Sequence, residues 1–152
     1  MQTKSRKRQN GLALVETLLV TPILLFLMLA TAEVTNAFVD HNTLSKSVRG
    51  AARYAASHAL LGTTGKVVLT AGLTNEARNL VIYGNVAGNG AALANGLASA
   101  NVQLTDLGSN NIKVTASYPY TGILGATLPA LGLGSDVNLG ITLQASVAMK
   151  AL

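Results

Sequence analysis

The chain contains no cysteine and no tryptophan, and aromatic residues make up only 4% of its 152 residues. Without cysteine it forms no disulfide bond and offers no thiol for nucleophilic catalysis, thiolate zinc binding or iron–sulfur ligation. The few aromatic residues are not interleaved with basic residues, so the stacking platforms of a nucleic-acid-binding surface are missing. We therefore expect neither thiol chemistry nor a nucleic-acid partner.

Charged residues are also scarce, at 11% of the chain, and they form no catalytic or metal-binding pattern. His41 and His58 are far apart in the sequence and have no metal-ligand companions at short spacing. No nucleophile motif is present, and no two acidic residues form a local pair for acid–base catalysis. The acidic residues are Glu16, Glu33, Asp40, Glu76, Asp106 and Asp136. An enzyme would have to assemble its site wholly from distant residues, so we expect no catalytic site, no metal site and no cofactor.

The sequence does contain one long apolar run, from Leu12 to Ala32, in which Glu16 is the only charged residue. A helix over this run would be about 31 Å long, which matches a hydrocarbon core of about 30 Å. A basic cluster precedes the run, and positive residues beside a span favour retention in the cytoplasm. The cluster consists of Lys4, Arg6, Lys7 and Arg8. We expect a single pass through a lipid bilayer, with a cytoplasmic N-terminus and an extracytoplasmic remainder.

Three interpretations of this N-terminal region differ in where the chain is cut. A secretory signal peptide would be cleaved after residues 30–32, Ala-Thr-Ala, and would release a soluble secreted domain beginning at Glu33. An uncut anchor would make the chain a single-span envelope scaffold, with Glu16 snorkelling to the headgroups. A prepilin-type signal would be cut between Gly11 and Leu12, which places Glu16 at the fifth position of the mature chain. The run exceeds the usual length of about 7–15 residues for a signal peptide, and together with the placed glutamate this favours the third interpretation.

The residues from Arg8 to Glu16, RQNGLALVE, resemble the start of TadE-like pseudopilins, the minor pilins of tight-adherence (Tad/Flp) type IV pilus and secretion systems. The resemblance continues through residues 51–56, 77–85, 114–120 and 143–150, and so spans nearly the whole chain. One departure is Thr17, where the family commonly has an aromatic residue.

This resemblance implies a structural pseudopilin of the bacterial inner membrane that is later assembled into a pilus or reaches the cell surface. Its implied roles are Tad pilus assembly, adhesion or secretion. It further implies processing by a prepilin peptidase, an aspartyl peptidase of the membrane. The other implied partners are the major and minor pilins of the same system and an inner-membrane assembly platform.

A charge pair is expected at the cytoplasmic end of the span. Processing after Gly11 would leave a charged amine on Leu12, about one helical turn from Glu16. Inside a fibre, a lone buried carboxylate and a lone buried ammonium are both unfavourable. We expect Glu16 of one subunit to pair with the Leu12 amine of its neighbour and so to fix the axial offset between them, a registry role that the resemblance also implies.

The span also contains a face of small residues and a proline. Ala13, Thr17 and Thr21 recur every four residues, and small residues at this spacing permit close helix packing in lipid. Pro22 removes one helical hydrogen bond and is expected to kink the helix. The kink is either a harmless bend or a flexible point that is used when the helix leaves the bilayer.

The helical pattern continues past the span, so one helix is expected from Leu12 to about Leu61, roughly 75 Å long. The stretch of residues 62–65, Gly-Thr-Thr-Gly, is the expected stop. Beyond the span, apolar or small residues recur at three- and four-residue steps and form one stripe. The stripe comprises Val34, Ala37 or Phe38, His41, Leu44, Val48, Ala52, Ala55 and Ala59. Lys46, Arg49 and Arg53 fall on another face, which we expect to be solvated.

The last part of the chain predicts a small domain with a sheet. Thr74 is the expected N-cap of a short helix that ends at Tyr83. Alternating apolar and polar residues predict antiparallel strands near 102–106, 112–118 and 141–149. The segment 121–140 is expected either as a loop over the edge of the core or as an intersubunit contact.

The expected fold class is therefore α+β, with a long N-terminal transmembrane helix that continues into a small pilin-like domain with a C-terminal antiparallel sheet. Residues 1–11 are the expected cytoplasmic leader, cleaved after Gly11, and residues 12–32 the transmembrane helix. Residues 33–61 are its extracytoplasmic continuation, and residues 62–152 form the small extracytoplasmic domain.

Overall fold

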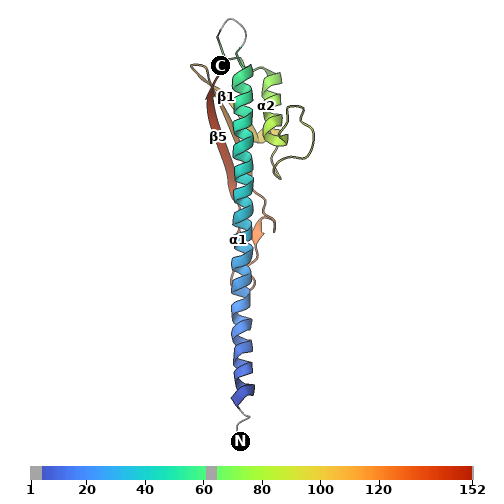
Figure 1. Cartoon of the computed structure of the whole chain (residues 1–152), viewed down its shortest axis with the longest axis vertical. Coiled ribbons are helices and arrows are strands. Elements are labelled where there is room, and N and C mark those ends of the chain that lie inside the picture. The colour runs from blue at the N-terminus through green and yellow to red at the C-terminus, as the bar shows by residue number, and fades with distance from the viewer. Residues whose placement is uncertain (1–4, 61–64, 152) are drawn as a thin grey trace. The chain divides into compact units, whose positions relative to one another are not determined.

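The structure is a computed structural model that describes residues 5–60 and 65–151, with side chains described from residue 11 onward. Its longest element is α1, a single α-helix of 54 residues from Ser5 to His58 (Figure 1). The helix begins before the expected Leu12 and ends before Leu61, which lies outside the described residues together with residues 62–64 of the predicted stop. The chain turns back directly after α1, because the Val68 N–H donates to the Ala59 carbonyl over 2.9 Å.

The second helix, α2, runs from Ala71 to Tyr83 and confirms the expected short helix, but the expected cap at Thr74 is wrong. The N-cap is Thr70, whose hydroxyl accepts a hydrogen bond from the Leu73 N–H at 3.2 Å. Thr74 already lies inside the helix, since its N–H donates to the Thr70 carbonyl over 2.9 Å. Gly84 ends α2 in a left-handed conformation, with φ 73°, which glycine adopts without strain.

Three strands form an antiparallel sheet in the order β1-β2-β5, and a short 3-10 helix, η2 (Ser99–Asn101), precedes it. The strands are β1 (Val102–Gly108), β2 (Asn111–Pro119) and β5 (Thr142–Lys150). The central strand pairs with both neighbours, so that Val114 lies opposite Leu104 on one side and Val147 on the other. The sheet and the long helix confirm the α+β fold class.

One buried cluster joins the sheet to the C-terminal half of α1. Along β2 the residues alternate between buried and more exposed, as the sequence predicted, with Val114 fully buried and Lys113 exposed. The predicted stripe on α1 is buried from Leu44 onward, whereas Val34 and Phe38 are 56% and 71% exposed. The buried apolar residues of α1 are Leu44, Val48, Ala51, Ala52, Ala55 and Ala56. Small alanines along this stretch let the neighbouring elements pack closely on the helix.

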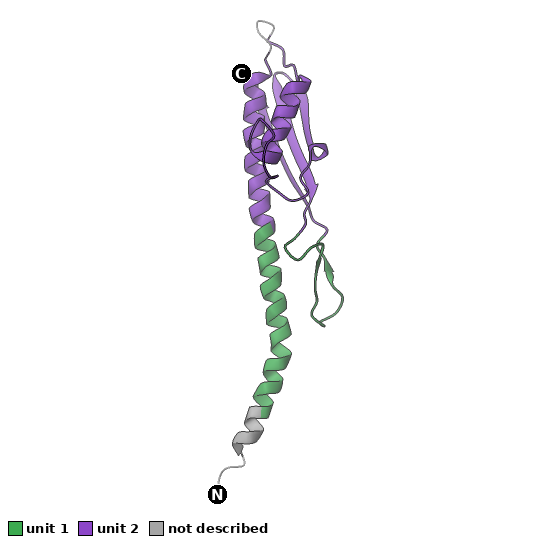
Figure 2. Cartoon of the chain, turned by 90° about the vertical axis from the view of Figure 1, so that its right-hand side faces the viewer, with its two compact units in different colours: residues 1–36, 122–139 green, residues 37–121, 140–152 purple. Residues whose placement is uncertain are grey.

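The chain divides into two compact units, drawn in different colours in Figure 2. Unit 2 comprises residues 37–121 and 140–152 and contains the buried cluster. Unit 1 comprises the residues up to 36 together with residues 122–139. Within unit 1, β3 (Thr127–Leu128) and β4 (Val137–Asn138) pair as a short antiparallel hairpin. The expectation of a loop over the core edge is therefore wrong for residues 122–139, which belong with the N-terminal part of α1.

Candidate membrane and subunit-contact site

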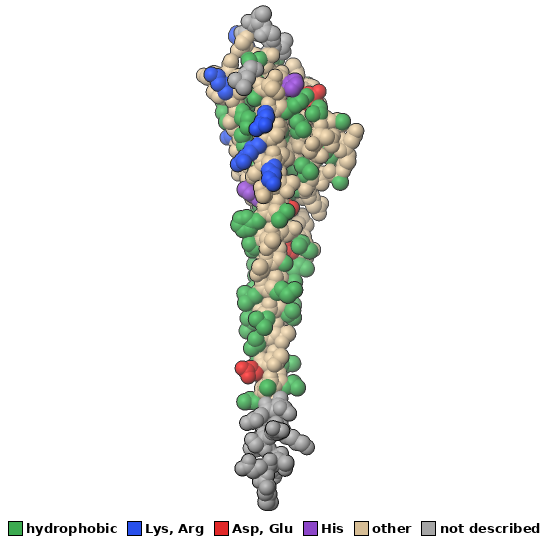
Figure 3. Space-filling model, in the orientation of Figure 1, with side chains coloured by type: hydrophobic (Ala, Val, Ile, Leu, Met, Phe, Trp, Pro, Cys, Tyr) green, Lys and Arg blue, Asp and Glu red, His purple; other side chains and the backbone are tan. Residues whose placement is uncertain are grey.

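The N-terminal part of α1 is an apolar surface that the described residues leave uncovered. Leu12, Leu14, Leu18, Leu19 and Met28 are each at least 66% exposed. Figure 3 shows apolar side chains along the described part of this helix below the charged region. α1 is one helix that is long and apolar enough to cross a membrane, and its most apolar stretch is entirely unburied. A signal sequence has the same length and apolar composition. The exposed apolar surface is therefore a property that a permanent membrane span and a cleaved signal sequence share.

The expected processing and registry residues lie together near the start of this surface. Gly11, Leu12 and Glu16 all lie exposed within α1. A Cβ added at Gly11 would meet no atom within 4 Å, so a side chain fits at this position without a clash. The pairing of Glu16 with a Leu12 amine involves two chains and stays a prediction. The predicted topology residue Lys4 lies outside the described residues, as do the side chains of Arg6, Lys7 and Arg8.

The predicted face of small residues lines a groove of about 880 Å³ along α1. The Thr17 hydroxyl donates to the Ala13 carbonyl over 2.9 Å, and the Thr21 hydroxyl donates to the Thr17 carbonyl over 2.7 Å. Both hydroxyls are thereby satisfied within the helix, so the face behaves as an apolar surface that lipid or another helix could cover. Leu131 of the hairpin in unit 1 lines the same groove.

Pro22 also lines this groove, and α1 continues through it without interruption. The part of α1 in unit 1 curves gently in Figure 2 and does not break. Any role of Pro22 as a flexible point therefore stays a prediction.

A buried carboxylate that sequence reasoning missed ties the hairpin of unit 1 to α1. Glu33 is only 3% exposed, and it is the one charged side chain among the buried residues of the described chain. Its Oε1 accepts a hydrogen bond from the Leu124 N–H at 2.7 Å, and its Oε2 accepts one from the Ile123 N–H at 3.2 Å. Two backbone donors offset the desolvation of the carboxylate. Glu33 thus holds the hairpin to the helix directly after the last residue of the expected span.

Gly122 makes this attachment possible. A Cβ built at Gly122 would lie 2.8 Å from the Cδ of Glu33, closer than real side-chain contacts allow. Any side chain at residue 122 would therefore force the Glu33 carboxylate to shift. A glutamate directly after an apolar run was the available sequence signal for Glu33, but nothing in the local pattern pointed to residues 122–124 as its partner.

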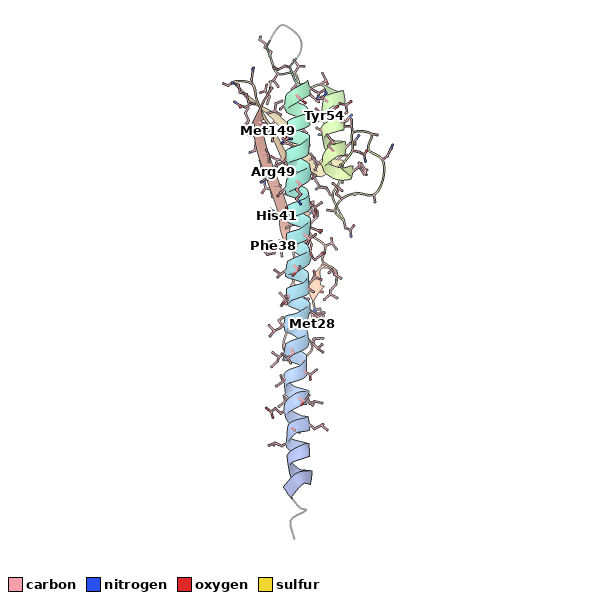
Figure 4. All side chains as sticks on the ribbon, in the orientation of Figure 1. Met28, Phe38, His41, Arg49, Tyr54 and Met149 are labelled. Carbon is pink, nitrogen blue, oxygen red and sulfur yellow. The ribbon has the colours of Figure 1, made fainter. Side chains whose placement is uncertain are left out.

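The predicted basic face is exposed, as expected. Lys46, Arg49 and Arg53 are all exposed on α1, and Figure 3 shows basic side chains gathered over this stretch. His41 is exposed about one turn before them, and it lines a small cavity together with Phe38. Both residues are labelled on α1 in Figure 4. His41 belongs to the predicted stripe, but the apolar residues of α1 are buried only from Leu44 onward, so this end of the stripe is exposed.

Polar contacts join α1, α2 and β1 at the edge of the core in unit 2. The Tyr54 hydroxyl donates to Glu76 Oε2 over 2.9 Å, and this bond raises the pKa of Tyr54. The Arg78 Nε–H donates to the Val102 carbonyl over 3.2 Å. The ring of His58 stacks on that of Tyr54 with centroids 4.3 Å apart. The two hydrogen bonds link neighbouring elements, whereas the stacked rings both belong to α1.

A second tyrosine is buried in the core without such a link. Tyr118 is 1% exposed, and its hydroxyl has no hydrogen-bond partner among the described residues. Burial raises the pKa of Tyr118 to about 12, with smaller contributions from the charges of Asp40 and Tyr120. Burial also raises the pKa of Asp40.

Within residues 5–60 and 65–151, no group of three or more acidic or histidine side chains is placed to hold a metal ion.

The comparison with known families bears on the N-terminal segment. Residues 11–53 match the family described as TadE-like protein. The matched region begins at the predicted cleavage residue Gly11 and contains Glu16, the apolar run, Glu33 and the basic face. No curated protein and no solved structure gave a match to the chain.

This match confirms the resemblance to TadE-like proteins over the part of the chain that it covers. The family indicates a pilin-like protein associated with Tad pili, with a structural role and association with other pilins. The apolar helix and the family together indicate attachment to a membrane.

Proposed function

We propose that the chain is a minor pilin of a Tad system that is inserted in the bacterial inner membrane and then assembled with other pilins. The observation that carries this proposal is the exposed apolar surface of α1, with Glu16 at the fifth position after Gly11. Residues 12–32 span the bilayer, and residues 33–152 lie outside the cytoplasm. An α-helix is the economical form for a lone span, because it satisfies its backbone hydrogen bonds internally.

The proposal includes a sequence of partners. A prepilin peptidase removes residues 1–11 on the cytoplasmic side, and an inner-membrane assembly platform brings the mature subunit to major and minor pilins. Glu16 and the new Leu12 amine set the stagger between neighbours, and the face of Ala13, Thr17 and Thr21 packs against an adjacent helix. The satisfied threonine hydroxyls support this packing, since they leave no unpaired donor at the interface.

The N-terminus of the protein purified from cells tests the proposal. N-terminal sequencing and intact mass should give a chain that begins at Leu12. A chain beginning at Glu33 would establish a secreted domain released by signal peptidase. A chain that keeps Met1 would favour the uncut envelope scaffold. Recovery in the membrane fraction, compared with the culture medium, gives a second measurement that separates the same outcomes.

A further inference from the structure

The hairpin of residues 122–139, called here the apolar hairpin, exposes large apolar side chains that the described residues do not cover. Ile123 is 67% exposed and Leu133 is 52% exposed, and the hairpin contains a single charged residue, Asp136. Leu124, Leu131 and Val137 are also more than 40% exposed. So dense a set of exposed apolar residues on a short segment marks a contact surface.

The apolar hairpin is fixed beside the proposed membrane span of the same chain. Glu33 binds the backbone N–H groups of Ile123 and Leu124, and Glu33 directly follows the last residue of the span. From this attachment the apolar hairpin extends alongside the part of α1 that belongs to unit 1, as Figure 2 shows. Its position along α1 is therefore set by contacts within one subunit.

The groove along α1 indicates how far the apolar hairpin reaches. Leu131 lines this groove together with Leu25 and Pro22. Leu25 lies seven residues before Ala32, which is about 10 Å along a helix. Elements that lie in the membrane interface insert their apolar side chains to a depth of about 5–10 Å. The groove extends along α1 from Leu25 back to Ala13, so Leu131 lies about 10 Å or more below the end of the span, inside the hydrocarbon core, when residues 12–32 span the bilayer.

Several backbone groups of the apolar hairpin are paired within unit 1, which lowers the free-energy cost of placing them in lipid. β3 and β4 form one ladder, Gly122 and Gly125 exchange hydrogen bonds, and the Leu139 N–H donates to the Ala126 carbonyl over 2.9 Å. The Ala130 N–H donates to Asp136 Oδ1 over 2.9 Å, so the single carboxylate of the hairpin also has a partner.

We propose that the apolar hairpin inserts its exposed leucines into the outer leaflet of the lipid bilayer, beside the α1 helix of its own subunit. This inference rests on the proposed membrane span. Lipid is the occupant because the attachment at Glu33 places the hairpin at leaflet depth in every single subunit, with no second chain needed. The protein would then be held by a helix and by a second contact.

The absence of cysteine makes a direct test possible, because each introduced cysteine is the only one in the chain. Three exposed leucines serve as matched positions: L133C in the apolar hairpin, L18C in the span and L107C near the end of β1. Leu18 and Leu107 are 68% and 54% exposed, so all three accept a label without disturbing a core. Each full-length variant carries an environment-sensitive fluorophore and is reconstituted at low density in phosphatidylethanolamine and phosphatidylglycerol vesicles. Some of the lipid bears a quencher on its acyl chain.

The expected result is a blue-shifted emission and strong quenching at positions 18 and 133, with neither at position 107. Quenching at 18 with a solvent-like signal at 133 would overturn the insertion of the hairpin and leave the span intact. A solvent-like signal at 18 would overturn the span itself. Quenching at all three positions would show non-specific adsorption to the vesicle and would also overturn the proposal.

A variant of the attachment provides a second measurement. Glu33→Gln removes the charge and replaces one acceptor oxygen with a donor, so the two backbone N–H groups lose one of their partners. Quenching at position 133 should fall in this variant, while quenching at position 18 stays unchanged. Equal quenching at 133 with and without the substitution would contradict the role of Glu33 in placing the hairpin.

Discussion

At the scale of single residues, two glutamates on the same helix have opposite surroundings. Glu33 is buried and bound by two backbone N–H groups of its own chain, whereas Glu16 is exposed on the apolar part of α1. A carboxylate that is satisfied inside the subunit stabilises the subunit. One that is exposed on a surface destined for lipid or for other helices needs a partner from outside. We therefore expect a substitution of Glu33 to affect the structure of the subunit, and a substitution of Glu16 to affect association with other subunits.

Glu16→Gln tests the proposed pairing with the Leu12 amine. The substitution keeps size and polarity but removes the charge, so the variant should insert in the membrane and be processed normally. Its association with partner pilins should be lost or strongly weakened, because the ammonium of the neighbour would be left unpaired. Co-purification of partner pilins from membranes, compared with wild type, measures this. Unchanged recovery would mean that Glu16 is only a snorkelling surface charge.

Tyr118 predicts a loss of stability at alkaline pH. Its pKa is raised to about 12 by burial, so between about pH 10 and pH 12 the unfolded state loses the phenolic proton before the folded state does. The free energy of unfolding should therefore be fully retained below pH 10 and fall by roughly 2–3 kcal/mol as the pH rises to 12. Unfolding of the full chain in detergent, followed by circular dichroism over this range, measures the effect.

Two phenylalanine variants separate this effect from general alkaline unfolding. Tyr118→Phe removes a hydroxyl with no hydrogen-bond partner among the described residues, so stability at neutral pH should be unchanged or slightly higher and the alkaline loss smaller. Tyr54→Phe breaks the bond to Glu76 and should lower stability at neutral pH. Equal losses of stability at neutral pH in both variants would contradict the conclusion that the Tyr118 hydroxyl lacks a hydrogen-bond partner and the Tyr54 hydroxyl has one.

At the scale of elements, the register of β2 determines which substitutions the sheet tolerates. Val114 is fully buried, whereas the next residue, Thr115, is partly exposed and its hydroxyl lies 3.1 Å from that of Ser146. Alternation alone would make Val147 as sensitive to a charge as Val114, but Val147 is only partly buried. Alternation along a strand therefore gives a graded sensitivity at these three positions.

Aspartate at each of these positions measures the gradient. Val114→Asp would bury an unpaired charge and should destabilise by about 4 kcal/mol or more. Val147→Asp should be intermediate, and Thr115→Asp should cost only about 1 kcal/mol, mainly through the lost hydroxyl contact. Chemical unfolding of the full chain in detergent provides the comparison. Similar tolerance of the charge at positions 114 and 115 would show that the register is wrong.

At the scale of the whole molecule, the features that the sequence predicted are those that depend on local pattern. The periodicity of α1 and the alternation in β2 and β5 follow from neighbouring residues, and the structure confirms them, in α1 from Leu44 onward. The cap of α2 was misplaced because Thr70 and Thr74 carry the same side-chain signal, and only the backbone conformation distinguishes them. The attachment of Glu33 was missed because its partner Ile123 is 90 positions away in the sequence. Contacts at that separation leave no local pattern to recognise.

The division into units also predicts that processing and folding are separable. Gly11 is exposed in α1, far in sequence from Leu44, the first of the buried apolar residues of the helix. A side chain at Gly11 meets no neighbouring atom, and valine is more favourable than glycine inside a helix. Gly11→Val should therefore leave the fold and the membrane span intact, and should block the peptidase alone, because the branched side chain stiffens the backbone and narrows its approach to an enzyme.

The expected product is a precursor that keeps residues 1–11 and stays in the membrane fraction, with the thermal unfolding of wild type. Gly50→Val is the matched control, since Gly50 is also exposed in α1 with no atom within 4 Å of an added Cβ. This control should be processed normally. It thereby distinguishes the general effect of replacing a glycine in the helix from a specific effect at the cleavage site. The intact masses of both variants, purified from membranes, show whether residues 1–11 have been removed. Normal maturation of Gly11→Val would place the cleavage elsewhere, and with it the free amine that Glu16 is proposed to bind.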